Sequence, residues 1–253
     1  RETVEGLIGL AATEDDQSLA VVQVASETDF AGRSDTFVQL VQDVTASVLS
    51  QNNVTNTTLT PDQLNALPGA GNNSSGSVKD LMDAAIIAIR ENLSIPSATK
   101  FIATGPQTLW VPYVHNKVPG TETGTAVAAV LVGPSDNSTV DADTVRAVGK
   151  RLAMHIVAAK PVYLGIDDVP KDVVDKERDV LQAQIEVDNK AGKPKPPEIV
   201  EKMIQGRLRK FYEQVCLTEQ AHMIEEGNPK VSKAVQAAGV DLHQYVYLAI
   251  GSQ

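Results

Sequence analysis

The sequence is poor in cysteine and in positive charge, and each shortage excludes a class of protein. Cys216 is the one cysteine in 253 residues, so no disulfide can form within the chain and a disulfide-stapled scaffold is excluded. Only 22 Lys and Arg stand against 32 Asp and Glu, which gives a net charge of −10. That charge repels phosphate backbones, so we expect no direct nucleic-acid binding. No stretch approaches the ~18 consecutive apolar residues that a membrane helix requires, so we expect no membrane insertion.

Motifs of common enzymes and metal proteins are also missing. The chain has no Gly-x-x-x-x-Gly-Lys-Ser/Thr loop and no Gly-x-Gly-x-x-Gly after a strand, which excludes the P-loop and Rossmann modes of nucleotide binding. The histidines lack His-x-x-x-His spacing, and a single cysteine cannot build a zinc site. Cys216 ends an amphipathic segment, where a buried structural thiol is favoured over a nucleophile. We therefore predict no catalytic centre, no metal site and no cofactor.

An internal repeat with a period of 108 residues is the most informative pattern in the chain. In the first copy, a β-type run at 19–24 precedes an acidic loop at 26–33, and Ser34 can cap the helix that follows. In the second copy the run is 127–132 and the loop is 133–141. Both helices carry an apolar stripe: Phe37, Leu40, Val41, Val44 and Val48 in the first copy, and Val145, Val148, Leu152 and Ile156 in the second. Two such strand–loop–helix modules predict an α+β core of two similar halves.

Further elements are predicted between and after the two copies. Residues 50–77 are rich in Asn, Thr, Ser, Gly and Pro, which is typical of an insertion or a flexible connection. Ser77 begins a capping box for a helix that we expect to end at Pro96, because proline stops helices. The expected apolar face of this helix is Val78, Leu81, Met82, Ile86, Ile89 and Leu93. Short apolar runs predict strands at 110–114 and 245–250, and we expect the second to return to the core sheet.

Residues 165–215 are unusually dense in charge, with ten Lys or Arg and eleven Asp or Glu against a chain average of 21%. Apolar residues recur at near-heptad spacing on both sides of a turn at 189–197: Val173, Val174, Val180, Leu181 and Val187 before it, and Val200, Ile204, Leu208, Phe211 and Val215 after it. This spacing predicts an antiparallel coiled-coil hairpin that projects from the core. The alternative is a pair of surface helices packed on the core.

Two residues are candidates for contact with a partner. Phe30 lies in the acidic loop, and the second copy has Ser138 at the equivalent position, so the fold plan does not require an aromatic there. An aromatic side chain beside carboxylates on a short rigid loop is typical of an interface anchor; the alternative is a phenylalanine that folds back over the sheet. His155 is equivalent to Ser47 and lies off the apolar stripe in both copies, which indicates either a solvated helix face or a contact residue.

Several segments resemble the elongation factor Ts family, the nucleotide-exchange partners of elongation factor Tu. Residues 22–31, Val-Gln-Val-Ala-Ser-Glu-Thr-Asp-Phe-Ala, look like the signature strand and loop of that family. The sequence Lys-Phe-Tyr-Glu at 210–213 is a second specific match. The resemblance covers most of the chain outside residues 50–105, and its other segments are 5–8, 113–115, 154–161, 168–170 and 206–220.

The sequence also departs from the family pattern. Nothing before Glu2 corresponds to the small three-helix module with which family members begin, and the chain stops at Gln253, where bacterial members usually continue. Ala25 and Ser26 replace the usual Asn-Cys. The insertion at 50–77 resembles mitochondrial members, whereas the retained hairpin resembles bacterial ones. These features favour the mitochondrial matrix as the location, with a bacterial cytoplasm or a plastid as alternatives.

The resemblance implies a guanine-nucleotide exchange factor that binds elongation factor Tu–GDP and promotes GDP release without covalent chemistry, and so is not an enzyme. It implies that Thr28, Asp29 and Phe30 form an exchange wedge, with Phe30 entering between helices of the GTPase. It also implies a second contact through Met154 and His155. The alternative function is a coiled-coil interaction or assembly protein that keeps the core but lacks exchange activity.

The expected architecture has three parts. An N-terminal core subdomain comprises residues 1–110, with the insertion inside it. A C-terminal core subdomain comprises residues 111–164 and 218–253, and the helical hairpin comprises residues 165–217. In some members of the family that the chain resembles, the hairpin contributes to partner contact or to self-association.

Overall fold

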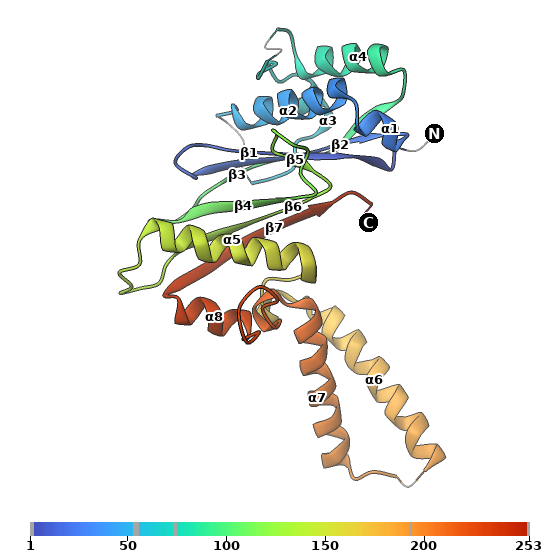
Figure 1. Cartoon of the computed structure of the whole chain (residues 1–253). Coiled ribbons are helices and arrows are strands. Elements are labelled where there is room, and N and C mark those ends of the chain that lie inside the picture. Colours follow the sequence, from blue (N-terminus) through green and yellow to red (C-terminus); the bar gives the residue numbers. More distant parts are fainter. Residues whose placement is uncertain (1–2, 53–55, 73–74, 193, 252–253) are drawn as a thin grey trace. The chain divides into compact units, whose positions relative to one another are not determined.

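The β-type runs of the sequence form two antiparallel sheets (Figure 1). One sheet has the strand order β3-β2-β1-β5 and the other has the order β4-β6-β7. The strands are β1 (Glu5–Ala12), β2 (Ser18–Ser26), β3 (Leu93–Ile102), β4 (Leu109–His115), β5 (Thr123–Gly124), β6 (Ala126–Pro134) and β7 (Val240–Ala249). The runs predicted as strands lie in β2, β4, β6 and β7 and are confirmed, whereas β1, β3 and β5 were not predicted.

The structure is a computed structural model that describes residues 3–52, 56–72, 75–192 and 194–251. The chain divides into unit 1, Arg1–Val157 with Gly239–Gln253, and unit 2, Ala158–Ala238. Residues 158–164 and 218–238, which the sequence assigned to the C-terminal core subdomain, fall in unit 2. The three-part division into two core subdomains and a hairpin stays a prediction.

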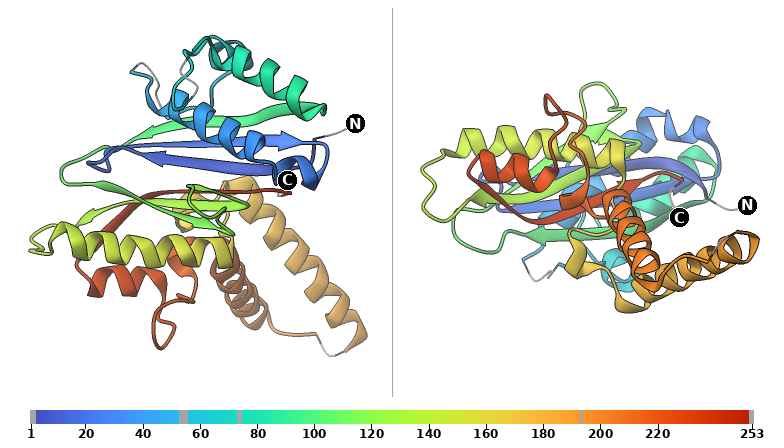
Figure 2. Two further views of the ribbon diagram at one scale, coloured as in Figure 1. Left: turned by 45° about the horizontal axis from the view of Figure 1, so that its top comes forward. Right: turned by 90° about the horizontal axis from the view of Figure 1, so that it is seen from below.

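Helices cover the outer faces of both sheets in unit 1, which gives the α+β fold predicted from the repeat (Figures 1 and 2). Helices α2 and α4 lie over the four-stranded sheet, and α5 lies over the three-stranded sheet. The helices that lie in unit 1, wholly or up to Val157, are α1 (Asp29–Gly32), α2 (Asp35–Leu49), α3 (Pro61–Asn65), α4 (Val78–Ile89) and α5 (Ala142–Ala159). Unit 2 contains α6 (Lys171–Ala191), α7 (Pro197–Val215), α8 (Val231–Ala237) and the 3-10 turns η1 (Ile166–Asp168) and η2 (Leu217–Glu219).

The apolar stripes of both copies of the repeat are buried, as predicted. Ser34 caps α2, since its hydroxyl accepts a 3.2 Å hydrogen bond from the Phe37 amide, and the α2 stripe packs with Val22 and Val24 of β2 in one core cluster. A second cluster fills the space between the two sheets. Its buried members are Ile8, Leu10, Leu19, Val21, Trp110, Val114, Val127, Ala129 and Leu131. Burial on this scale is the main stabilising contribution, at about 25 cal/mol per Å² of apolar surface.

Helix α4 ends earlier than the sequence predicted. It begins at the Ser77 capping box, but it stops at Ile89 because Arg90 adopts the left-handed conformation, with φ of 63°, and turns the chain. The predicted continuation to Pro96 is wrong, since Leu93 and Pro96 both lie in β3. A proline is tolerated there because β3 is an edge strand and its pairing with β2 is irregular between Gln23 and Ala25.

Part of the predicted insertion, residues 50–77, packs on α2 through polar contacts. The buried Asp43 carboxylate accepts the Asn72 amide at 2.9 Å, and the Ser47 hydroxyl accepts the Ala70 amide at 2.9 Å. Gly71 has φ of +80°, and a Cβ there would lie 2.4 Å from the Asp43 carboxylate. Residues 53–55 and 73–74 of the insertion lie outside the described residues.

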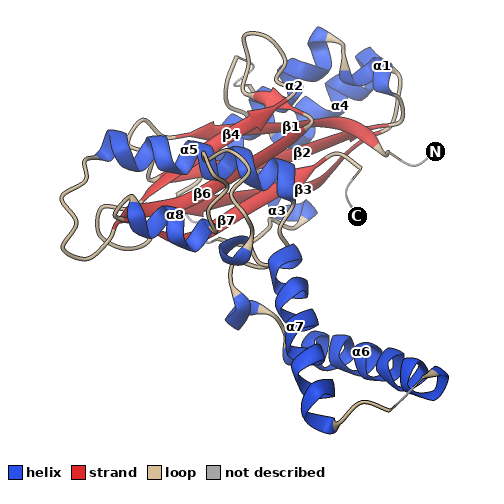
Figure 3. Ribbon diagram, turned by 60° about the horizontal axis from the view of Figure 1, so that its bottom comes forward, coloured by secondary structure: helices blue, strands red, loops and turns tan. Residues whose placement is uncertain are grey.

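In unit 2, α6 and α7 run antiparallel and pack against each other (Figure 3). The buried seam contains Leu181, Ile185, Ile204 and Leu208. The expectation that Val180 and Val187 join this seam is wrong, because they are 62% and 65% exposed. Ile185, four residues after Leu181, continues the seam on one face and leaves the valines about 100–160° away around the helix. The coiled-coil interpretation of this hairpin stays a prediction, and residue 193 of its turn lies outside the described residues.

Candidate functional site

Phe30 is the most exposed large apolar side chain in the described part of the chain, at 78%. It lies on the short helix α1, whose other side, Ala31 and Gly32, is buried. On this side α1 lies close to β1, since a Cβ on Gly32 would be in ordinary van der Waals contact, at 3.9 Å, with the Cα of Gly6. The alternative in which Phe30 folds back over the sheet is therefore wrong. The acidic loop presents its aromatic ring to solvent.

Glu91 holds the start of α1 in place from 63 residues away. One carboxylate oxygen of Glu91 accepts the Thr28 hydroxyl at 2.6 Å, and the other accepts the Thr28 amide at 3.1 Å. The Thr28 hydroxyl oxygen in turn accepts the Ala31 amide at 3.4 Å as the N-cap of α1. The buried Ser26 hydroxyl donates to the Thr28 carbonyl at 2.9 Å. These bonds fix the backbone that carries Phe30.

The surface around Phe30 is acidic. Asp29 is exposed and forms an ion pair with Arg33 at 3.1 Å, one helical turn away. Exposed pairs of this kind contribute little to stability, typically up to about 1 kcal/mol, so Asp29 can exchange Arg33 for another partner at low cost. Glu27 accepts a hydrogen bond from the Asn92 side chain. The second anchoring contact, like that of Glu91, therefore comes from the segment between α4 and β3.

The equivalent loop of the second copy is built differently. Ser138, at the position of Phe30, uses its hydroxyl to accept the Val140 amide at 3.3 Å. A Cβ on Gly239 would lie 2.6 Å from that hydroxyl, so the loop packs closely against the residue that precedes β7. The second loop is thus closed onto its own sheet, whereas the first presents an aromatic ring.

Met154 and His155, the predicted second contact, lie next to each other on α5 but differ in exposure. Met154 is half-buried, whereas His155 is fully buried. The expectation that His155 lies on a solvated face is wrong. Its repeat equivalent Ser47 is also buried, so both helices bury polar positions beside their apolar stripes, which a stripe of apolar residues alone does not reveal.

Cys216 is buried, as predicted for a structural thiol. Burial, with smaller effects from the Glu219 and Asp168 carboxylates, raises the pKa of this thiol to about 11. The reactive thiolate is therefore scarce at neutral pH. Among the described residues, no group of three or more His, Cys, Asp or Glu side chains is placed to hold a metal ion. Within the same residues, no helix has the length and hydropathy to cross a membrane.

The sequence did not identify Glu91 as part of this site. No local motif marks it, because its role depends on the turn at Arg90, which brings the end of α4 beside Thr28. The cluster of Tyr113, His115 and Lys150, on β4 and α5, was also missed, although Tyr113 to His115 belongs to a segment that resembled the family.

Comparison with known proteins identifies relatives along most of the chain. The family model described as Elongation factor TS matches residues 27–252. Elongation factor Ts of Paramagnetospirillum magneticum is 34% identical over 252 residues, which are 98% of this chain and 72% of the relative. Elongation factor Ts of Gluconobacter oxydans is 32% identical over 251 residues, covering 99% and 75%. Elongation factor Ts of Rhodospirillum rubrum is 36% identical over 245 residues, covering 96% and 71%. The range that the family model matches begins after the first strand of the repeat and includes both predicted contacts.

Proposed function

The chain belongs to the elongation factor Ts family, and from this premise we propose that it is a guanine-nucleotide exchange factor for elongation factor Tu. It binds the GDP form of that GTPase and promotes release of GDP, so that GTP can bind. Translation elongation is the role that family membership supports. The observation that carries the exchange proposal is the exposed Phe30 on a backbone held by Glu91.

The mechanism follows from linkage between two binding equilibria. A GTPase holds GDP through backbone amides around the phosphates and through Mg²⁺, which requires near-octahedral coordination. A partner that binds better when this arrangement is distorted weakens nucleotide binding by the same factor. By resemblance to the family, Phe30 enters between helices of the GTPase, and Asp29 approaches the Mg²⁺ side of the nucleotide site. No covalent step is needed.

The pre-formed wedge explains why a small element can do this. Thr28 and Glu91 fix the position of α1 before binding, so little conformational entropy is lost when the partner docks. Buried aromatic anchors of this kind dominate interface energies. Met154, which is half-buried on α5, supplies surface for the second contact, and the neighbouring buried His155 supports it.

The direct test is release of a fluorescent GDP analogue from elongation factor Tu. We expect the intact chain to accelerate release and Phe30→Ala to lose about 1–3 kcal/mol of transition-state stabilisation, the scale of an aromatic hot spot. Ile102→Ala is the matched control, since Ile102 is exposed and pairs with the opposite end of β2. No acceleration by the intact chain would exclude the exchange function and leave the alternative, an assembly protein without exchange activity.

Self-association through the hairpin is a second, separate proposal. Val180 and Val187 are exposed one heptad apart on α6, and apolar rows at this spacing commonly pack against another helix. We expect Val180→Asp combined with Val187→Asp to abolish concentration-dependent association in sedimentation equilibrium. Gln182→Asp, an exposed change on the opposite side of α6, is the control. A wild-type chain that remains monomeric at high concentration would exclude this proposal.

The location in the cell also stays a proposal. The insertion at 50–77 supports the mitochondrial matrix, and the bacterial sources of the relatives support a bacterial cytoplasm. A plastid is the third alternative. Fractionation of the source cells with an antibody against the chain would decide between them.

A further inference from the structure

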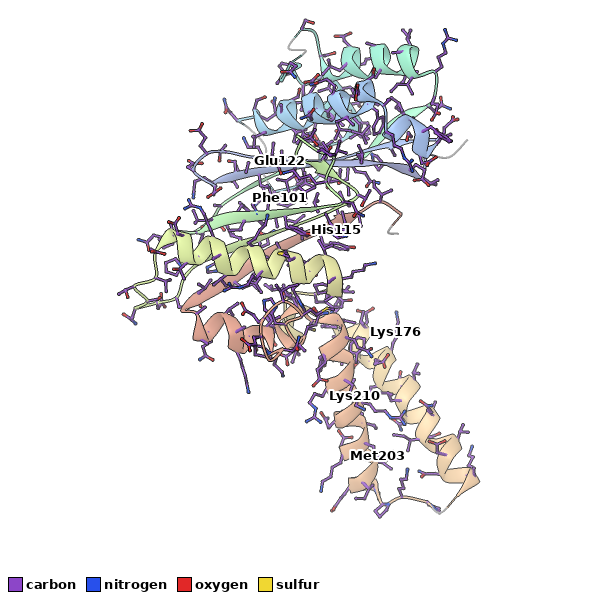
Figure 4. All side chains as sticks on the ribbon, viewed as in Figure 1. Phe101, His115, Glu122, Lys176, Met203 and Lys210 are labelled. Carbon is purple, nitrogen blue, oxygen red and sulfur yellow. The ribbon has the colours of Figure 1, made fainter. Side chains whose placement is uncertain are left out.

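Tyr113, His115 and Lys150 form a side-chain cluster on unit 1, which we name the β4–α5 cluster. Tyr113 and His115 are two residues apart on β4 and so share a face of the sheet, and the Tyr113 hydroxyl lies 3.1 Å from His115 Nδ1. The Lys150 ammonium, on α5, lies 5.1 Å from the centroid of the Tyr113 ring. His115 (labelled in Figure 4) and Lys150 are exposed. The Lys150 ammonium therefore lies close to the Tyr113–His115 pair, which keeps one hydrogen in its mutual bond and can donate the other to an anion.

The cluster is held in place before any partner arrives. Gly149 brings α5 close to β4, since a Cβ at that position would lie 2.8 Å from Val111. Lys150 follows directly and donates a 3.3 Å hydrogen bond to the Pro112 carbonyl. The contact with the Tyr113 ring is a cation–π interaction. A lysine side chain restrained at both points loses less rotamer entropy on binding than a free one.

The fold alone does not account for this lysine. The repeat provides an internal comparison, in which Gln42 of α2 is equivalent to Lys150 and Ala46 is equivalent to Met154. The first module therefore folds without a cation at this position. The outer edge of β4 is also protected in other ways, since the Trp110 amide bonds to the Asp16 carbonyl at 2.9 Å and Pro112 has no amide hydrogen.

Charge along α5 singles out Lys150. Arg146, one turn earlier, is neutralised by Asp16 at 2.8 Å and by Asp143 at 3.1 Å. Within the part of the chain that the structure describes, Lys150 forms no ion pair with a carboxylate. Met154, one turn later, adds half-buried apolar surface. The result is a cationic position next to an apolar one, in a chain with a net charge of −10.

We propose that the β4–α5 cluster and Met154 bind a carboxylate-bearing segment of elongation factor Tu. This proposal rests on the proposed exchange function and adds the exposed His115 to the second contact of Met154 and the buried His155. The carboxylate would accept hydrogen bonds from Lys150 and from the Tyr113–His115 pair. The net charge disfavours a nucleic-acid phosphate as the occupant.

This contact differs in its role from the one at Phe30. Phe30 belongs to the layer on the four-stranded sheet, whereas the cluster lies on the outer face of the three-stranded sheet. The two therefore meet different parts of the GTPase. An exposed charge contact of this kind changes the association rate and the salt dependence more than the chemistry at the partner's nucleotide site. The cluster would set the affinity, and Phe30 would set the maximal rate.

The test compares Lys150→Glu, Lys150→Ala and Lys150→Arg in binding to elongation factor Tu and in GDP release. At about 50 mM salt we expect Lys150→Glu to raise the GTPase concentration needed for half-maximal release by about tenfold or more, and Lys150→Ala by about threefold, with little change in the maximal rate. Lys150→Arg keeps the charge and should restore most of the affinity. At about 500 mM salt the differences should shrink to within about twofold.

Lys117→Glu is the matched control, because it makes the same change in net charge at an exposed lysine just beyond β4 that is paired with Glu122. Equal effects of Lys150→Glu and Lys117→Glu would overturn the proposal, since the effect would then be one of net charge. A loss of maximal rate at unchanged affinity would also overturn it.

If the wild-type chain binds but does not accelerate release, the exchange function fails and the binding comparison still tests the cluster. Binding of a short RNA that Lys150→Glu abolishes would assign the site to a phosphate instead.

Discussion

At the scale of single residues, Thr28 and Glu91 connect local structure to function. Both carboxylate oxygens of Glu91 accept bonds from Thr28, and Thr28 caps the helix that carries Phe30. A change in the orientation of the Phe30 side chain would reduce its fit between the helices of the GTPase. Glu91 is therefore a positioning residue for the wedge.

Glu91→Ala is expected to slow stimulated GDP release while leaving Phe30 in the chain. Each hydrogen bond to a charged acceptor contributes at most about 1.5–3 kcal/mol. Losing both bonds to Glu91 would therefore also make helix α1 less ordered. We expect Glu91→Gln, which keeps one acceptor oxygen, to be intermediate. Combining Glu91→Ala with Phe30→Ala separates positioning from stability: if Glu91 acts through Phe30, the double variant releases GDP no more slowly than Phe30→Ala alone. Additive losses would show that Glu91 acts independently.

Cys216 is expected to be unreactive in the folded chain. Its folded pKa, about 11, lies above the ordinary value of 9.0, so folding favours the protonated thiol. The resulting stabilisation is fully present below pH 9 and is lost as the pH rises through about 11. At a pH of about 8, iodoacetamide should modify Cys216 rapidly only after unfolding in urea. Rapid modification of the native chain would contradict the burial, and Cys216→Ser should leave GDP release unaltered.

The exposure of Phe30 could be predicted from the sequence, but the burial of His155 could not. The repeat provided a matched position, Ser138, that separated what the fold needs from what it does not. The same comparison misled for His155, because both Ser47 and His155 are buried polar residues. An apolar stripe marks the centre of the buried face of a helix. The borders of that face depend on neighbouring elements that lie far away in sequence.

At the scale of helices and strands, two glycines in helix interiors provide opposite expectations. A Cβ on Gly149 would lie 2.8 Å from Val111 and 3.1 Å from Val132, whereas a Cβ on Gly206 in α7 would meet no atom within 4 Å. Gly149→Ala should destabilise unit 1 by about 1–3 kcal/mol through overpacking, despite its better helix propensity. Gly206→Ala should stabilise α7 by about 0.5–1 kcal/mol. Urea titrations of both variants check this pair, and a stabilising Gly149→Ala would mean that α5 can move away from β4 freely.

The elements that the sequence predicted well are those with local signals. Ser34 and Ser77 mark helix starts through side-chain caps, and β6 is a continuous apolar run. Strand β3 had no such signal, since Pro96 suggested a helix stop and the strand depends on pairing with β2. The boundary of α4 was equally hidden, because Arg90 takes a left-handed conformation without being glycine. Edge strands and irregular pairings are decided by tertiary contacts, which local patterns do not contain.

At the scale of the whole molecule, the single tryptophan reports on one unit only. Trp110 is fully buried between the two sheets of unit 1, 5.4 Å from the Phe101 ring. The hairpin of unit 2 rests on a smaller seam of four buried residues. We expect the helical circular-dichroism signal to begin falling at lower urea concentration than the Trp110 fluorescence signal. Superimposable curves would show instead that the two units unfold as one cooperative system.

The pairing of β7 with β6 has a consequence for how the protein is made. Pro134 pairs with Val240, so roughly a hundred residues, unit 2 included, are synthesised between these two strands. At about 5–20 residues per second, β6 leaves the ribosome about 5–20 s before its partner exists. Unit 2 can fold in that interval, whereas the three-stranded sheet must keep one edge open until the last strand emerges. A nascent chain that has emerged from the ribosome as far as α8 would therefore carry a finished hairpin and an unfinished core, which is the stage at which chaperones would be most needed.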